Sequence, residues 1–272
     1  MSHARITVSA DPLAVHLPRG WRLMRLAEAD STNAVLRRLV ETGAEAHEGL
    51  VVWAEWQTAG RGRAGRDWVG APGNLYMSLL VAAPMIDSAP AARAAELGFI
   101  AGLAVVEAIQ TLAPARAPDN LLACKWPNDV LFDGAKVAGI LLESLTAPSG
   151  EALVVVGIGI NAHPVDVPKA LYPVTSLAER EIRVNAPRLL EAVVHAFAAR
   201  LAHWRRDGFA PVRAEWLRRA AGLGQLVTVD LPGGPVTGRF ADLDTDGALV
   251  LDGTDGARRR VLAGDLLPPP RR

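Results

Sequence analysis

The residues best suited to chemistry lie in the segment Gly60–Trp68, which reads GRGRAGRDW. Its glycines allow tight turns and a close approach of the backbone to a ligand. Its arginines carry permanent positive charge on planar forks that suit phosphate. No Gly-Lys-Ser/Thr follows, so the segment is not a P-loop. Taken alone, this Gly/Arg loop fits an exposed basic turn, even one that contacts RNA, as well as a phosphate site.

Two lysines open further polar motifs. The run Lys125–Asp129 (KWPND) ends a short apolar segment, and side chains at strand ends commonly face a ligand crevice. Asn128 can hydrogen-bond an adenine edge, and Asp129 can hold a metal ion or a ribose hydroxyl. Lys136 begins an apolar run in which Gly139 removes a side chain where something can approach. By itself, each motif is more typical of a surface turn or a solvated lysine.

Two more candidate groups accompany apolar segments. Gly157–Asn161 (GIGIN) puts two glycines on one face of a strand, which leaves room for a flat ligand or for close packing. A bulge with an Asn turn fits equally well. Ser31 and Thr32 precede a helical segment and are typical capping residues, although backbone amides at a helix start also suit a polar ligand. Gln57, at the start of the Gly/Arg loop, is grouped with them.

Composition excludes several classes of protein. Lys+Arg and Asp+Glu both total 29, whereas general nucleic-acid binders usually have a basic surplus. The single cysteine, Cys124, cannot form an internal disulfide or a multi-cysteine zinc site and is expected to be a buried, inert thiol. The histidines form no HExxH pair, and no Gly-x-Ser-x-Gly elbow is present. The longest apolar stretch, 97–106, is too short to span a membrane, so we expect a cytoplasmic protein.

Periodicity and turn residues predict the elements that must position these motifs. Helices are predicted at 34–41, 91–112, 187–206 and 212–221. Strands are predicted at 50–56, 75–82, 121–126, 130–132, 136–145 and 152–160. Tight turns at Asp133-Gly134 and Pro148–Gly150 join consecutive strands. The expected fold is therefore α+β, with a mixed or antiparallel sheet and helices on one side.

The pattern changes after Gly222. Short strands are predicted at 226–230, 236–242, 248–252 and 259–262, with Gly- and Asp-rich turns between them. Closely spaced short strands of this kind are typical of a small β-barrel. We therefore predict two domains, a large one at 1–222 and a small one at 223–272.

These motifs occur together in the order found in biotin protein ligases, and the chain resembles that family. The Gly/Arg loop is similar to the family's Gly-Arg-Gly-Arg-x-Gly-Arg-x-Trp segment, and Pro72–Tyr76 to the strand that follows it. The family's Lys-Trp-Pro-Asn-Asp, Lys-hydrophobic-Ala-Gly-Ile-Leu and Gly-x-Gly-x-Asn motifs match 125–129, 136–141 and 157–161. The resemblance runs from about Asp30 to Leu267. It implies a class II synthetase-like biotin/lipoyl ligase core and a C-terminal SH3-like barrel.

The resemblance also implies the reaction. Such a ligase uses ATP to make biotinyl-5'-adenylate and passes the biotin to a lysine of an apo biotin carboxyl carrier protein. Lys136 and Arg63 would be the catalytic cations, gripping first the biotin carboxylate and then the α-phosphate. Residues implied to bind biotin are Ser31, Thr32, Gln57, Gly60, Arg61, Arg63, Lys136 and Gly139. Residues implied to bind ATP are Arg66, Trp68, Asn128, Asp129 and Asn161, with Mg²⁺ at Asp129.

Elementary chemistry agrees with these roles. The biotin carboxylate and the α-phosphate repel each other, so cations must already be in position. The mixed anhydride is easily hydrolysed, so the Gly/Arg loop should close over it and exclude water. Trp68 would then stack on adenine. The loop's arginines have no evident partners in the sequence, and we therefore expect a mobile loop without ligand.

Two departures and two alternatives accompany the resemblance. Ala64 stands where many relatives carry arginine, so that position is not expected to be essential. Only about thirty residues precede Ser31, which leaves no room for the helix-turn-helix domain of relatives that repress transcription; we expect a ligase without DNA or membrane binding, and a homodimer is compatible. The enzyme alternative is a lipoate or octanoyl transferase, which lacks the loop with Trp68. The non-enzymatic alternative is a nucleotide- or RNA-binding module.

Overall fold

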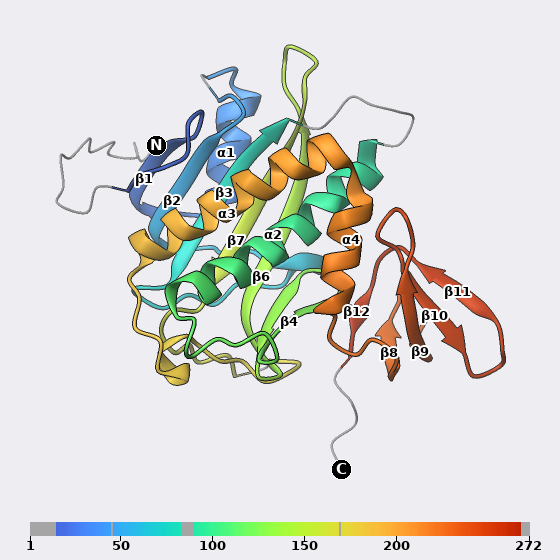
Figure 1. Ribbon diagram of the computed structural model, residues 1–272. Helices are drawn as coiled ribbons and strands as arrows, with labels where there is room; N and C mark the ends of the chain where they lie inside the picture. Colours follow the sequence, from blue (N-terminus) through green and yellow to red (C-terminus); the bar gives the residue numbers. More distant parts are fainter. Residues whose placement is uncertain (1–14, 45, 83–89, 169, 268–272) are drawn as a thin grey trace.

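A seven-stranded sheet forms the centre of the computed structural model, which describes residues 15–44, 46–82, 90–168 and 170–267 (Figure 1). From one edge to the other, its strands are β1 (Arg22–Ala29), β2 (Leu50–Gln57), β3 (Leu75–Ala82), β7 (Ala152–Ile160), β6 (Ala135–Thr146), β5 (Asp129–Phe132) and β4 (Leu122–Lys125). β1 and β2 are parallel and all other neighbours are antiparallel, so the predicted mixed sheet is confirmed. The edge strand β1 was not predicted, because its alternation of apolar and charged residues is weak.

The long β6–β7 hairpin aligns two of the sequence motifs. Gly139 lies opposite Gly159, and Leu141 lies opposite Gly157. The glycines of two separate motifs therefore meet on adjacent strands, and three side chains are missing from one region of the sheet. Asp133 and Gly134 form the predicted turn between β5 and β6, both with positive φ.

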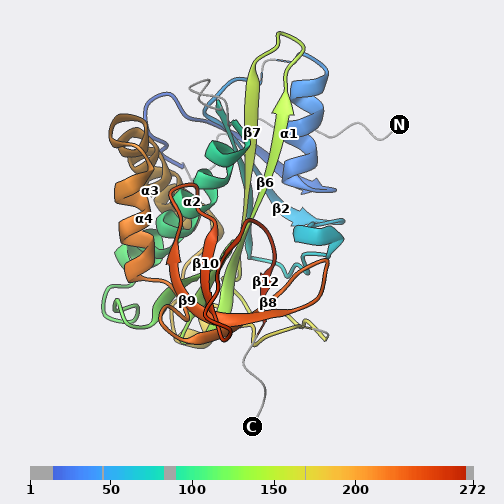
Figure 2. The ribbon, with the colours of Figure 1, turned by 90° about the vertical axis from the view of Figure 1, so that its right-hand side faces the viewer.

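Helices cover both faces of the sheet, so the prediction of helices on one side is wrong (Figure 2). α2 (Pro90–Leu112), α3 (Ala186–Asp207) and α4 (Phe209–Arg218) lie on one face, and α1 (Thr32–Glu41) lies on the other. The reason is visible in β2, where Val51 packs into the larger core and Val52 into the smaller core beneath α1. A strand that is buried on both faces is a continuous run of apolar residues in the sequence. Such a run does not show whether helices cover one face of the sheet or both.

The helix α2 is the central core element. By length and composition, 94–112 could cross a membrane, but 72% of its apolar window is buried inside the protein. Cys124 packs beside this helix, and burial raises the pKa of its thiol to about 12. The prediction of a buried, inert cysteine is therefore confirmed.

A second, smaller sheet follows α4. Its antiparallel order is β11 (Arg258–Val261), β10 (Leu249–Gly253), β9 (Val236–Leu243), β8 (Leu226–Asp230) and β12 (Asp265–Leu266). The strand β12 was not predicted, since two residues carry no periodicity. Pairings among the described residues do not join β11 to β12, so a closed barrel stays a prediction. Trp126 Nε1 donates to Gly247 O at 3.2 Å, and Arg213 on α4 pairs with Asp242 on β9 at 2.6 Å. These contacts hold the small sheet and its turns against the larger part of the protein.

Candidate active site

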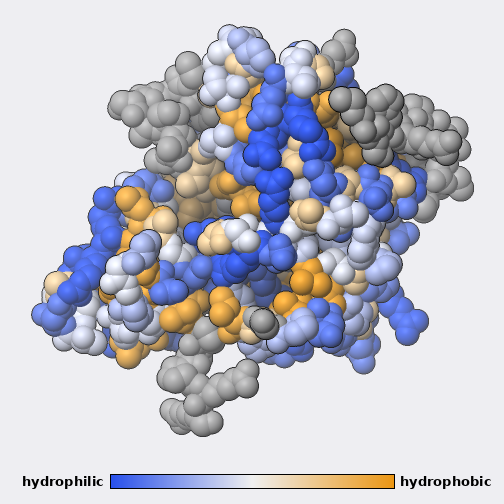
Figure 3. Space-filling view, turned by 180° about the vertical axis from the view of Figure 1, so that it is seen from behind, coloured by the Kyte–Doolittle hydropathy of each residue, from blue (hydrophilic) through white to orange (hydrophobic). Residues whose placement is uncertain are grey.

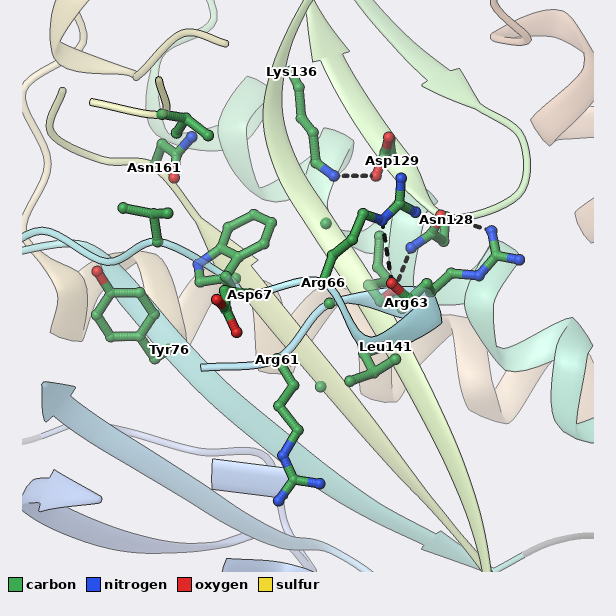
Figure 4. Close-up of a pocket in the computed structure, with 18 of the residues that line it drawn as sticks. Arg61, Arg63, Arg66, Asp67, Tyr76, Asn128, Asp129, Lys136, Leu141 and Asn161 are labelled. Atoms are coloured by element: carbon green, nitrogen blue, oxygen red, sulfur yellow. Dashed lines mark hydrogen bonds and ion pairs between the residues drawn. The ribbon is translucent and has the colours of Figure 1, made fainter. Parts of the chain in front are cut away.

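A cavity of about 480 Å³ lies between the Gly/Arg loop, the β6–β7 hairpin and the start of α1. Figure 4 shows the loop crossing the hairpin, with Lys136 and Asp129 pointing toward each other on one side of it. The predicted residues Ser31, Thr32, Gln57, Arg61, Arg63, Arg66, Trp68, Asn128, Asp129, Lys136, Gly139 and Asn161 all line this cavity.

Seen from behind, the molecule shows apolar residues in separate places between polar ones, without one continuous apolar face (Figure 3).

One end of the cavity is formed by the start of α1. Ser31 is the N-cap residue, with extended φ and ψ of −157° and 138°, but its side chain makes no capping hydrogen bond. Gln57 supplies that bond instead, because its Oε1 accepts from the backbone N–H of Thr32 at 2.8 Å. The N-cap position predicted for Ser31 is therefore confirmed, while its buried hydroxyl makes no capping hydrogen bond. Beneath Thr32 lies Ser78, a buried residue that sequence reasoning missed because nothing marks a serine within an apolar strand.

The other end of the cavity holds a buried cluster of charges. Asp129 is buried, and its carboxylate oxygens lie 2.6 Å from Lys136 Nζ and 3.7 Å from Lys125 Nζ. Burial lowers the pKa of Lys125 to about 8, against the opposing effect of Asp129. The ring of Tyr172 lies 3.6 Å from Lys125 Nζ, and burial raises the pKa of its phenol. Lys125 and Tyr172 had no predicted role.

The Gly/Arg loop contacts the small C-terminal sheet. Asp265, on β12, lies 3.3 Å from Arg63 Nη1 and 2.9 Å from Arg66 Nη2. Arg63 also donates to Gly264 O at 3.2 Å and to Asn128 Oδ1 at 3.3 Å. The two arginines therefore have partners that are more than 190 residues away in sequence, which no local pattern could reveal. Sequence reasoning missed Asp265 for the same reason.

Trp68 packs against the glycines of the hairpin. A Cβ added at Gly139 or Gly159 would lie 2.7 Å or 2.6 Å from atoms of the Trp68 ring. The indole ring of Trp68 thus fills the space left by the missing side chains of these two glycines. The buried Nε1 of Trp68 has no hydrogen-bond partner among the described residues. Gly60 is needed for close approach as well, because a Cβ there would lie 2.7 Å from Trp68 O.

The two asparagines predicted to read adenine are engaged within the protein. Asn128 Nδ2 donates to Ile140 O at 2.7 Å while its Oδ1 accepts from Arg63. Asn161 Nδ2 donates to Thr175 O at 3.2 Å. Arg61 lines the cavity but points away from the Lys136–Asp129 pair (Figure 4). The site therefore brings most of the predicted residues together and leaves Arg61 apart from the charged cluster.

The residues present do not fit a resident magnesium ion. Within the described part of the chain, no group of three or more His, Cys, Asp or Glu side chains could hold a metal ion. Asp129, the predicted ligand, faces two lysines instead. Mg²⁺ usually keeps several waters and binds through one or two carboxylates plus substrate phosphates. Magnesium is therefore considered only as the ion that accompanies nucleotide substrate.

Comparisons with known proteins agree with this geometry. Residues 28–161 match the Biotin/lipoate A/B protein ligase family, and residues 222–266 match the Biotin protein ligase C terminal domain. A solved structure, the biotin protein ligase from Aquifex aeolicus in complex with biotin and ATP, is similar with a TM-score of 0.74 and 28% identity, covering 90% of this chain and 97% of that one.

Curated relatives are closer in sequence. The biotin–[acetyl-CoA-carboxylase] ligase of Paracoccus denitrificans is 42% identical over 85% of this chain and 94% of its own length. The enzyme of the same name from Mycobacterium tuberculosis is 36% identical over 91% of this chain and 90% of its own length. Sequence identity at this level over nearly the whole length of each relative, together with the assembled site, shows that the chain belongs to the biotin protein ligase family.

Proposed function

We propose that the protein uses ATP to activate biotin as biotinyl-5'-adenylate and transfers the biotin to a lysine of an apo biotin carboxyl carrier protein. The observation that carries the assignment is the division of one cavity into two ends. A polar end is formed by Ser31, Thr32 and Gln57, and a charged end is formed by Lys136 and Asp129. Lys125 lies 3.7 Å from Asp129 and adds a second cation to that end. A ligand with a neutral polar ring and a distant carboxylate matches this arrangement.

In the proposed first step, the biotin carboxylate attacks the α-phosphorus of ATP, and pyrophosphate leaves. Lys136 and Arg63 offset the negative charge that the two reactants bring together. In the second step, the neutral amine of the carrier lysine attacks the carbonyl carbon of the anhydride, and AMP leaves. Ser31, Thr32 and Gln57 hold the ureido ring with help from the backbone at Arg61. The apolar strand faces hold the chain of biotin, and Gly60 and Gly139 lie beside the bound ligand.

ATP occupies the charged end in this proposal. Arg66 contacts phosphate, and Trp68 stacks on adenine after the loop has moved off the glycines. Asn128, Asn161 and Asp129 contact the nucleoside, and Mg²⁺ enters with the triphosphate. Arg63 contacts Asn128 Oδ1 at 3.3 Å, so in this proposal Arg63 turns toward phosphate as Asn128 contacts adenine.

The remaining parts of the proposal concern the whole protein. We place the domain boundary near residue 222 and the protein in the cytoplasm, without DNA or membrane as a partner; a homodimer is compatible with this proposal. The decisive experiment incubates the purified protein with biotin, ATP, Mg²⁺ and an apo carrier domain. We expect pyrophosphate release and a biotinylated carrier lysine. Labelling by lipoate instead of biotin, or no labelling by either, contradicts the assignment.

A further inference from the structure

A buried chain of hydrogen bonds runs beneath the polar end of the cavity. It joins Glu143 on β6, Asn33 on α1, Ser78 on β3 and Thr32 at the start of α1. Asn33 and Thr32 are each 3% exposed and Ser78 is fully buried. The sheet is built around this chain, because a Cβ at Gly157 would lie 2.2 Å from Asn33 Oδ1.

The first bond in the chain fixes the orientation of an amide. Asn33 Nδ2 donates to Glu143 Oε2 at 2.7 Å and faces Leu141 O at 3.5 Å. A carboxylate and a carbonyl can only accept hydrogen bonds, so the amide nitrogen must point toward them. Arg37 Nη1 lies 4.0 Å from the other oxygen of Glu143 and supplies a counter-charge. The oxygen of Asn33 is thereby directed toward Ser78.

The next two bonds fix the hydroxyl protons. Ser78 Oγ lies 2.6 Å from Asn33 Oδ1 and 2.7 Å from Thr32 Oγ1. Because Asn33 Oδ1 can only accept, the single proton of Ser78 goes to it, and Ser78 accepts the proton of Thr32. The other neighbour of the Thr32 hydroxyl, Gln57 Oε1 at 3.2 Å, already accepts from the backbone N–H of Thr32 at 2.8 Å. The Thr32 proton therefore goes to the nearer Ser78 oxygen, and lone pairs of the Thr32 hydroxyl are left for a ligand in the cavity.

We propose that Glu143, Asn33 and Ser78 are positioning residues that fix the Thr32 hydroxyl as a hydrogen-bond acceptor, so that the site selects a ligand that presents an N–H there. The inference rests on the proposed function in one respect, namely that Thr32 contacts the ureido ring of biotin. An analogue with a ring oxygen at that position would place its lone pairs against those of the Thr32 hydroxyl, so neither oxygen would have a hydrogen-bond donor. Buried groups left without a partner weaken binding steeply.

The test measures selectivity between biotin and its two cyclic carbamate analogues, in each of which one ureido N–H is replaced by oxygen. Binding to the purified protein is measured by calorimetry without ATP. In the wild type, we expect one analogue to bind on the order of 100-fold more weakly than biotin. We expect that ratio to fall in Glu143→Gln and to fall further, by about tenfold, in Glu143→Lys. An ammonium can only donate, so Asn33 turns over and the proton order of the chain reverses.

A second variant and a matched control sharpen the test. Ser78→Ala breaks the chain at its middle and is expected to lower the ratio as well. In the double variant with Glu143→Lys, the ratio should fall no further, because both changes interrupt one chain. Glu151→Lys makes the same charge change at an exposed position in the turn before β7 and is expected to keep the wild-type ratio.

The outcomes separate this inference from the proposed function. If the Glu143 variants weaken binding of biotin and analogue by the same factor, or leave both unchanged, the positioning role is wrong. Thr32→Val tests the shared assumption. If it leaves biotin affinity unchanged while the carrier is still labelled, Thr32 is not the ureido contact and the positioning role falls with it. If neither protein nor variants bind biotin at all, the proposed function itself fails.

Discussion

The two walls of the cavity are held in different ways. The floor, made by the start of α1 and strands β3, β6 and β7, is fixed by hydrogen bonds among three buried neutral side chains and one partly exposed carboxylate. The Gly/Arg loop is held by ion pairs between Asp265 and two arginines whose side chains are 26% and 39% exposed. Partly exposed ion pairs contribute little to stability, whereas buried polar networks define one arrangement.

The floor and the Gly/Arg loop therefore have different roles in ligand binding. The floor is preorganised for one ligand shape, because none of its groups can turn without leaving a buried partner unsatisfied. The loop is exchangeable, because a phosphate can replace the carboxylate of Asp265 at little cost. Asp265 thus contacts the two arginines that phosphate contacts in the proposed reaction. The expectation that the loop arginines lack partners is wrong for Arg63 and Arg66, while mobility of the loop stays a prediction.

The largest effect is expected from the charged end of the floor. Lys136→Ala removes the cation that lies 2.6 Å from Asp129 and that would meet the reacting carboxylate and phosphate. We expect a loss of roughly 2–4 kcal/mol of transition-state stabilisation, comparable with loss of one oxyanion donor. Single-turnover adenylate formation measures it, with Arg183→Ala as an exposed control. Turnover close to wild type would make Lys136 an ordinary structural lysine.

The comparison of floor and loop predicts different effects on global stability for the same substitution, Gly→Ala. Gly157→Ala forces a methyl group against Asn33 and should lower the free energy of unfolding by about 1–3 kcal/mol, as overpacked cores do. Gly65→Ala meets no neighbouring atom but requires alanine at a φ of 71°. That cost, about 1–2 kcal/mol, is local to the loop, which can open without unfolding the protein. Urea denaturation of both variants checks the order; equal losses contradict the division.

Charge at the buried end should be visible in the pH profile. Because the pKa of Lys125 lies at about 8, below the ordinary value for lysine, this side chain loses its charge in the free enzyme as pH rises through 8. We therefore expect kcat/KM for ATP to fall above about pH 8, since this ratio reports groups of the free enzyme. Lys125→Arg keeps a cation at all these pH values and should abolish the fall in kcat/KM above pH 8. If the variant shows the same fall, the titrating group is not Lys125.

The contacts of Arg63 in the Gly/Arg loop predict that the adenylate leaks from the site when they are lost. Arg63→Gly removes the bonds to Asn128 and Asp265 and adds backbone freedom, so adenylate should form but escape and acylate lysines of bystander proteins. The experiment compares labelling of a carrier domain with labelling of an unrelated lysine-rich protein. Ala64→Gly is the matched control, because Ala64 already has a φ of 53° and its replacement adds freedom without removing a cation. Bystander labelling at the wild-type level, with adenylate made, would show that the loop is not the gate.

The smallest effect is expected at the contact between the domains. Asp265→Asn weakens two partly exposed ion pairs, worth about 0.2–1 kcal/mol each. Amide hydrogen exchange across 61–68 should rise a few-fold without ligand and return to the wild-type rate with bound adenylate. Asp252→Asn removes an ion pair with Arg258 on the same small sheet and should leave the loop unchanged. If both variants behave alike, Asp265 has no special role in holding the loop.

The sequence by itself determined the helices and strands and the kinds of functional group available at the site. β3, β7 and β8 have the predicted bounds, because turn residues and apolar runs are local signals. The motifs 60–68, 125–129, 136–141 and 157–161 meet in one cavity as the family resemblance implied. The family itself could be read from their order.

Only the tertiary structure decided which groups hold those motifs in place. Ser78 and Asp265 lie in stretches without any motif, and they matter because strand pairing carries one beneath Thr32 and the docked small sheet carries the other to Arg63. The side-chain hydrogen bond at the start of α1 comes from Gln57 rather than from the N-cap residue Ser31 for the same reason, since β2 ends beside the helix start. Local sequence fixes which groups are available, while long-range pairing fixes which of them satisfy one another.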